Sequence, residues 1–169
     1  MEYHLRRTER EIRDEEEIRS IIEQGTYAVV GLARDNEPYV VSLSYAYDPE
    51  LNALFFHCAK EGLKLEFLGV NNRACATIID DDGYQSGSCD HAYKTLILRG
   101  TMVPVDDPQE VDRALRLLVT HLEKHDVNRF MSKLHPENKG YQATRVLRMT
   151  ITEITGKARG CAAVPQSAS

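Results

Sequence analysis

The amino-acid sequence predicts a mainly β protein, a closed or partly closed antiparallel β-barrel with peripheral helices. Six segments rich in β-branched and aromatic residues are bounded by turn-forming residues. Short turns join the first three segments, and strands joined in this way pair antiparallel. No G-x-G-x-x-G motif or P-loop follows a strand, which argues against a parallel nucleotide-binding sheet. The predicted strands are residues 27–33, 38–47, 53–57, 73–80, 93–105 and 143–154.

Capping residues predict the two longer helices. Asp14 precedes an apolar-periodic stretch, and Glu17, three residues later, completes a capping box. The second helix begins after Asp107 with Pro108 in its first position, and its pattern extends to His125.

The remaining segments are less regular. A short helix is predicted over residues 63–70, directly after a strand and a glycine. The acidic, Gly- and Ser-rich stretch 80–92 is predicted to be an exposed loop, and residues 126–142 to be irregular.

Length and composition limit the classes of function that the chain can have. The 169 residues fit one domain, placed at residues 1–160, with a mobile tail over residues 161–169. A net charge of -5 argues against a non-specific nucleic-acid binder, and no apolar run is long enough to cross a membrane. The charged N-terminus lacks the apolar core of a signal peptide, which predicts a cytoplasmic protein. The four cysteines form no C-x-x-C pair, which predicts free thiols and no metal site.

Lys64 stands out because it falls in the first turn of the short helix. A helix N-terminus offers free backbone N–H groups and a partial positive charge. Gly62 would let a ligand approach the backbone, and Lys64 would add a mobile positive charge. These features suit a phosphate or a carboxylate. The alternative is a surface lysine paired with Glu61 or Glu66.

The histidines indicate a functional site less clearly than Lys64 does. His57 ends an apolar strand and is compatible with a structural or a functional role. His91 lies in the predicted loop without a partner motif. His121 and His125 are four residues apart but lack the H-E-x-x-H order, which favours a solvated helix face. Because no self-sufficient catalytic group emerges, an enzyme of this sequence would depend on a cofactor.

Residues 16–78 carry a family resemblance, through the motifs "PYVV", "LFFH", "G-x-K" and "NNR". Further along, "LRGT" and "ITEITGK" continue it. In their order and spacing these motifs resemble the pyridoxamine 5'-phosphate oxidase-like FMN-binding split-barrel superfamily, and within it the nitroimidazole-resistance (Nim-type) branch. The similarity extends over about residues 5 to 160.

The resemblance implies a split β-barrel, a homodimer and FMN bound at the dimer interface. It also implies a flavin-dependent oxidoreductase that acts on a small aromatic or nitroaromatic substrate with a nicotinamide or another electron donor. His57 would be the catalytic residue, and Lys64 would hold the FMN phosphate. The implied cofactor-binding residues are Val40, Val41, Ser42, Leu43, Ser44, Tyr45, Phe56, His57, Gly62, Lys64 and Thr95.

Two features depart from the family pattern. Leu63 stands where the family commonly has a second basic residue, so Lys60, Arg73, Lys94 or Arg99 would have to help hold the phosphate. The chain lacks tryptophan and the C-terminal segment that binds the substrate of a true pyridoxamine phosphate oxidase, which argues against that activity.

Other functions remain open at this stage. The barrel could bind a flavin without catalysis, or haem with His57 or His91 as axial ligand. The fold could also serve only as a dimeric scaffold.

Overall fold

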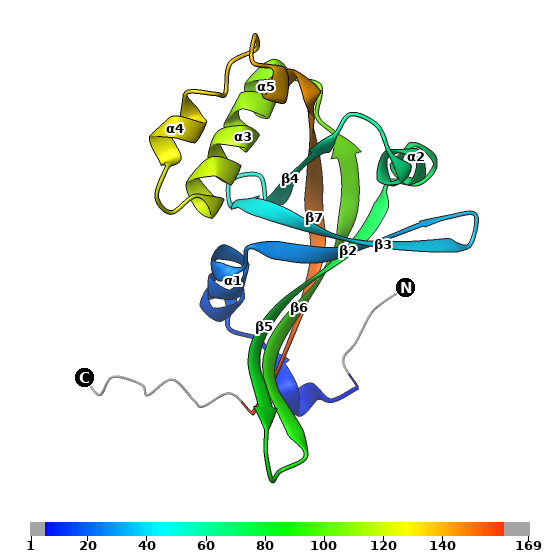
Figure 1. Cartoon of the computed structure of the whole chain (residues 1–169). Coiled ribbons are helices and arrows are strands. Elements are labelled where there is room, and N and C mark those ends of the chain that lie inside the picture. Colours follow the sequence, from blue (N-terminus) through cyan, green and yellow to red (C-terminus); the bar gives the residue numbers. More distant parts are fainter. Residues whose placement is uncertain (1–5, 161–169) are drawn as a thin grey trace.

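The computed structural model describes residues 6–160, whose strands form one sheet that closes on itself (Figure 1). The order in the sheet is β1-β7-β4-β3-β2-β5-β6, and β6 also pairs with β7, so that β2 to β7 complete a ring. All pairings are antiparallel. The expected barrel is therefore confirmed. The strands are β1 (Glu11–Ile12), β2 (Tyr27–Arg34), β3 (Glu37–Asp48), β4 (Ala53–Ala59), β5 (Arg73–Gln85), β6 (Asp90–Pro104) and β7 (Thr144–Arg159).

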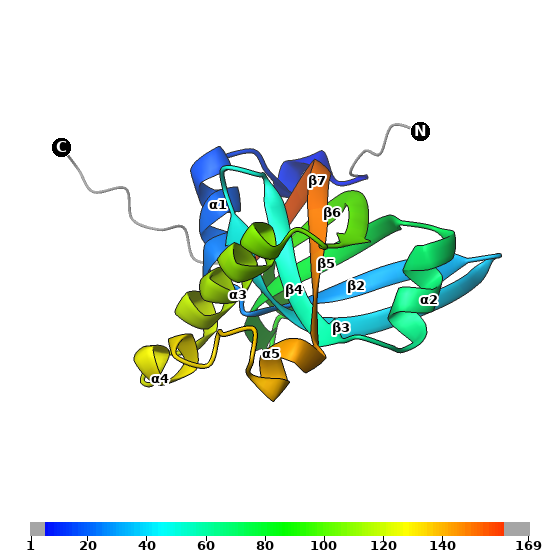
Figure 2. The same ribbon diagram turned by 90° about the horizontal axis from the view of Figure 1, so that it is seen from above.

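Helices cover the outside and one end of the barrel. Figure 2 shows α3, α4 and α5 together on one side of the barrel, with α2 on another. The helices are η1 (Thr8–Arg10), α1 (Glu15–Gln24), α2 (Leu63–Val70), α3 (Pro108–Leu122), α4 (Val127–Met131) and α5 (Lys139–Ala143). Asp14 and Asp107 cap α1 and α3 as predicted, each accepting a hydrogen bond from a backbone N–H of the first turn.

Two apolar cores follow from the alternation of side chains along the strands. Leu54 and Phe56 of β4 point into the barrel, where they join the main core. Phe55, between them, points outward and packs with Ala114 and Leu118 of α3 in a second core. Because β4 contributes to both cores, four consecutive residues, 53–56, are buried.

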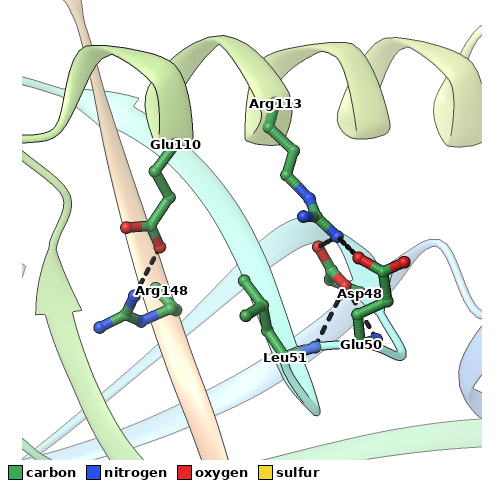
Figure 3. A network of polar contacts seen from close by, with 6 residues as sticks. All are labelled: Asp48, Glu50, Leu51, Glu110, Arg113 and Arg148. Atoms are coloured by element: carbon green, nitrogen blue, oxygen red, sulfur yellow. Dashed lines mark hydrogen bonds and ion pairs between the residues drawn. The ribbon is translucent and has the colours of Figure 1, made fainter.

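Two ion pairs also join α3 to the sheet (Figure 3). Arg113 contacts Asp48 at the end of β3, and Glu110 accepts a hydrogen bond of 2.6 Å from Arg148 of β7. Both carboxylate–guanidinium contacts therefore fix the start of α3 over the second core.

Three sequence predictions were wrong in detail. Residues 80–92 are not a loop, because β5 and β6 continue as a paired hairpin through most of them, with an irregularity at Asp81 and Gly83. Their polar composition is that of a two-stranded ribbon with little to bury. Residues 126–142 contain α4 and most of α5, which extends to Ala143, and α3 ends at Leu122 rather than His125.

Two further predictions concern membrane spans and the C-terminal tail. Within residues 6–160, no helix has the length and apolar character needed to span a membrane. The predicted tail, residues 161–169, lies outside the described residues.

Candidate functional site

The barrel opens where β3 and β4 separate. Their pairing ends at Tyr45 and Phe56, while β4 continues along β7 as far as Ala59. The preceding part of β3, from Glu37 to Ser44, pairs with β2. Inside the opening, Phe67 of α2 packs its ring 5.2 Å from that of Tyr39. One edge of β3 from Glu37 to Ser44 thus has no neighbouring strand within residues 6–160.

The predicted cofactor-binding residues of β3 divide between the two faces of the strand. Val40, Ser42 and Ser44 point outward and are exposed. Val41 and Leu43 point inward and pack against the main core, where they are half-buried. Outward side chains and the backbone of this segment are accessible, as a ligand lying along the strand would require.

Two predicted contact residues are fully buried. The hydroxyl group of Tyr45 donates a hydrogen bond of 2.6 Å to the carbonyl oxygen of Ile22. The ring of Phe56 lies in the main core. Only the backbone of either residue could therefore touch a cofactor outside the barrel.

Gly62 and Lys64 form the start of α2 as predicted. Gly62 has φ 132°, a conformation that side-chain-bearing residues rarely adopt, so glycine is required here. A Cβ atom at this position would meet no other atom within 4 Å, so the space beside the helix start is open. Lys64 is half-buried in the first turn.

A second cation that the sequence did not indicate lies near Lys64. Arg145 of β7 pairs in register with Cys58 of β4. Burial raises the pKa of the Cys58 thiol, while the charges of Lys64 and Arg145 oppose that rise. Both charges thus act on the same thiol, and Arg145 also forms a 2.9 Å ion pair with the exposed Asp106. Arg145 is far from Lys64 in the sequence, and only the β4–β7 register brings the two together.

The other cations proposed as helpers lie elsewhere or remain unassigned. Lys94 forms a 2.9 Å ion pair with Glu17 of α1. Arg73 and Arg99 line a shallow groove on the outside of β2, β5 and β6. Lys60 is exposed in the turn before Gly62.

His57 is exposed at the end of β4 and lines a pocket under α3 and α5. His91 and His121 make contacts of their own. The Nε2 atom of His91 lies 2.7 Å from Asp81 in the β5–β6 hairpin. His121 is half-buried with Nε2 2.7 Å from the carbonyl oxygen of Gly25, so its predicted solvated position was wrong. His125 lies beyond the end of α3, and the described residues contain no metal-binding cluster.

Thr95 lies on the outer face of β6. Its hydroxyl group is 3.1 Å from that of Thr77 and donates to the carbonyl oxygen of Ile78. The same outer face carries Tyr27, Val40 and Ile79, which are 54%, 65% and 50% exposed. Thr95 thus belongs to an exposed, partly apolar sheet face.

A family model described as "Pyridoxamine 5'-phosphate oxidase" matches residues 14–158. The chain belongs to this family. The superfamily expected from the sequence is thereby confirmed. No curated protein sequence matches the chain significantly.

Solved structures of the pyridoxamine 5'-phosphate oxidase fold resemble the chain closely. A candidate 5-nitroimidazole antibiotic resistance protein from Bacteroides thetaiotaomicron shares 27% identity, with a TM-score of 0.71 over 87% of this chain and 85% of that one. A flavocytochrome from Azotobacter vinelandii shares 19% identity, with a TM-score of 0.77 over 98% and 76% of the two chains.

A third structure is the FAD and haem binding protein from Mycobacterium smegmatis. It shares 17% identity with this chain, with a TM-score of 0.66 over 90% of this chain and 74% of that one. The first of the three structures agrees with the Nim-type branch expected from the sequence. The two with lower identity establish the fold alone.

Proposed function

We propose that this chain is an FMN-binding flavoprotein that acts as a homodimeric oxidoreductase on a small aromatic or nitroaromatic substrate. The observation that carries the proposal is the open start of α2, where Gly62 has φ 132° and Lys64 stands in the first turn. Arg145, opposite Cys58 on β7, is a second cation available nearby. A phosphate monoester carries close to two negative charges at neutral pH and is bound by such groups. The known binders of flavin and haem among proteins of this fold support a flavin in general.

The chain offers matching groups for the rest of the cofactor. The accessible backbone of β3 from Val40 to Ser44 can donate and accept hydrogen bonds along a flat heterocycle. Val40 supplies apolar surface and Ser42 a hydroxyl group on the outward side. The predicted roles of these residues, of Gly62 and of Thr95 remain part of the proposal.

Bound FMN would supply two-electron transfer between a nicotinamide donor and the substrate. The protein would orient both molecules and hold a proton. His57 is the residue that we assign to this role, because its imidazole is exposed at the end of β4 and lines a pocket. An imidazole can bind and release a proton near neutral pH.

The dimer part of the proposal depends on the outer sheet face. Val40, Tyr27 and Ile79 expose at least half of their surface there. A second copy of the chain would remove this apolar area from water, and Thr95 could then reach a cofactor held by the partner.

Vitamin B6 oxidation is not proposed, since the chain contains no tryptophan. We expect the protein in the cytoplasm, as its sequence predicts.

A second candidate is a haem- or flavin-binding module without catalytic activity. It is favoured by one observation, which is that His57 lines a pocket and could ligate an iron atom. His91 is a poorer candidate, because the Asp81 carboxylate already occupies its Nε2 atom as a hydrogen-bond acceptor.

Absorption spectroscopy of the purified protein, followed by release and mass analysis of the bound cofactor, tests the proposal. We expect flavin absorption bands and released FMN, and steady oxidation of NADH or NADPH with a nitroaromatic acceptor. A Soret band would favour the haem-binding candidate. A protein that remains colourless after incubation with excess FMN would disprove the proposed function.

A further inference from the structure

A pocket of about 310 Å³ lies between the outside of the barrel and α3, α4 and α5. Figure 1 shows these three helices on one side of the barrel, next to the ends of β4 and β7. Because α4 and α5 belong to a segment predicted to be irregular, this pocket was not predicted from the sequence. His57 contributes a polar ring to it. The apolar wall consists of Leu115, Leu118, Leu122, Phe130, Leu134 and Tyr141.

Glu123 and Lys133 also line the pocket, and two further polar side chains help to build it. Asn138 caps α5, accepting a hydrogen bond of 2.8 Å from the backbone N–H of Gly140. The Thr144 hydroxyl group donates to the carbonyl oxygen of Gly140 at 2.7 Å. Lys133 lies with its Nζ atom 4.9 Å from the centre of the Phe130 ring. His57, Glu123 and Lys133 are thus the polar side chains that remain to meet a ligand, and His57 is the one without a fixed charge.

Size and chemistry together define the class of ligand. Small-molecule pockets span about 300–1,000 Å³, so this one suits a molecule of one or two rings. Its wall is mainly apolar, and the opposite charges of Glu123 and Lys133 at the lining favour neither an anion nor a cation. A neutral aromatic molecule with one hydrogen-bonding group would bury its rings against the leucines and meet His57 with its polar group.

We propose that this pocket binds a small, neutral aromatic molecule, with His57 at its polar end and α4 and α5 selecting the ligand. The inference deepens the proposed function, because the same His57 would connect the pocket with the cofactor site. It assigns the substrate to a place built by residues outside the barrel. The pocket can also bind its ligand if the protein proves to carry no flavin.

The test is the binding of nitrobenzene to the full chain as purified, measured by ligand-observed NMR titration. Leu134→Trp places an indole ring in the pocket and should weaken binding at least tenfold. Leu117→Trp is the matched control, because Leu117 is also half-buried beside the second core but lies outside this pocket. It should bind nitrobenzene like the parent protein. His57→Gln should weaken binding by only a few-fold.

Benzoate, which has the shape of nitrobenzene but a negative charge, tests the predicted neutrality of the ligand. We expect it to bind at least tenfold more weakly than nitrobenzene. Equal binding of the two, no binding of nitrobenzene to the parent, or unchanged binding to Leu134→Trp would overturn the inference. Haem binding to the parent protein that is lost in Leu134→Trp would also overturn it.

An FMN titration of the same proteins separates the two proposals. FMN binding without nitrobenzene binding would refute the pocket assignment and leave the flavoprotein proposal standing. If the chain binds nitrobenzene but not FMN, and Leu134→Trp blocks nitrobenzene binding, the pocket assignment stands and the flavoprotein proposal is refuted.

Discussion

The Nη2 atom of Arg113 lies 2.7 Å from Oδ2 of Asp48, a carboxylate that is 1% exposed. The other oxygen of Asp48 accepts hydrogen bonds from the backbone N–H groups of Glu50 and Leu51, which close the turn between β3 and β4 (Figure 3). One side chain therefore shapes this turn and attaches it to α3. The same helix forms a wall of the proposed ligand pocket.

Replacing Arg113 with methionine should lower the free energy of unfolding by about 2–4 kcal/mol, because the Asp48 charge would remain buried without its partner. Arg116→Met is the control, since Arg116 pairs with Asp112 on the exposed side of α3 and such a pair contributes less than about 1 kcal/mol. Urea unfolding followed by circular dichroism measures both variants. Equal losses would show that the burial of Asp48 has no energetic consequence.

Lys64→Gln and Arg145→Gln should each weaken FMN binding by about 10- to 100-fold, as expected for the loss of a charge-assisted hydrogen bond. Riboflavin, which lacks the phosphate group, should bind both variants as it binds the parent. Fluorescence titration with the two flavins gives the comparison. Lys60→Gln serves as the control, because Lys60 is exposed in the preceding turn. A similar loss of riboflavin affinity would contradict the phosphate assignment.

Val40→Glu should convert the proposed dimer into a monomer, since it places a charge in the apolar outer face. Val70→Glu is a matched control, because Val70 is 61% exposed but belongs to the end of α2. Light scattering coupled to size-exclusion chromatography measures the molar mass. A parent protein that is monomeric at all accessible concentrations would refute the dimer, and a dimer that survives Val40→Glu would place its interface elsewhere.

The Cys58 thiol should react with iodoacetamide more slowly than Cys75 and Cys89 at pH 8. Burial raises the pKa of Cys58, so less of the reactive thiolate is present, and the other two thiols are exposed. Lys64→Ala should slow Cys58 further, because it removes a charge that opposes the rise in pKa. Peptide mass mapping over time gives each rate. An unchanged Cys58 rate in this variant would show that the charge of Lys64 does not act on the sulfur atom.

Local signals predicted most of the barrel. The turn between β2 and β3 contains Asp35 and Asn36, which both adopt the positive φ that favours such turns. Caps at Asp14 and Asp107 predicted where α1 and α3 begin. The β5–β6 hairpin was missed because its strands are polar on both faces, so no hydrophobic alternation marks them.

The candidate site was less predictable, because long-range pairing assembles it. Gly62 and Lys64 are neighbours in the sequence and were identified together. Arg145 joins them only through the pairing of β7 with β4. The ligand pocket depends on α5, a helix of one turn whose cap, Asn138, stands in a segment without apolar periodicity.

Tyr45→Phe should lower the free energy of unfolding by about 1–2 kcal/mol, because the carbonyl oxygen of Ile22 would lose its buried donor. Burial also raises the pKa of Tyr45, so its hydroxyl group stays protonated and keeps donating at any pH where the fold is stable. Tyr47→Phe is the control on the same strand, since the Tyr47 hydroxyl group bonds Asn52 at the exposed surface, and its loss should cost less than about 0.5 kcal/mol.

The same hydroxyl group leaves little room at Gly25. A Cβ atom there would come within 3 Å of both Tyr45 and Ile78, so Gly25→Ala should destabilise the fold. In the Tyr45→Phe background that cost should be smaller, because one of the two close contacts is gone. Urea unfolding of the single and double variants gives the coupling free energy. Strict additivity would show that the end of α1 shifts to accommodate the methyl group and that Tyr45 does not fix its position.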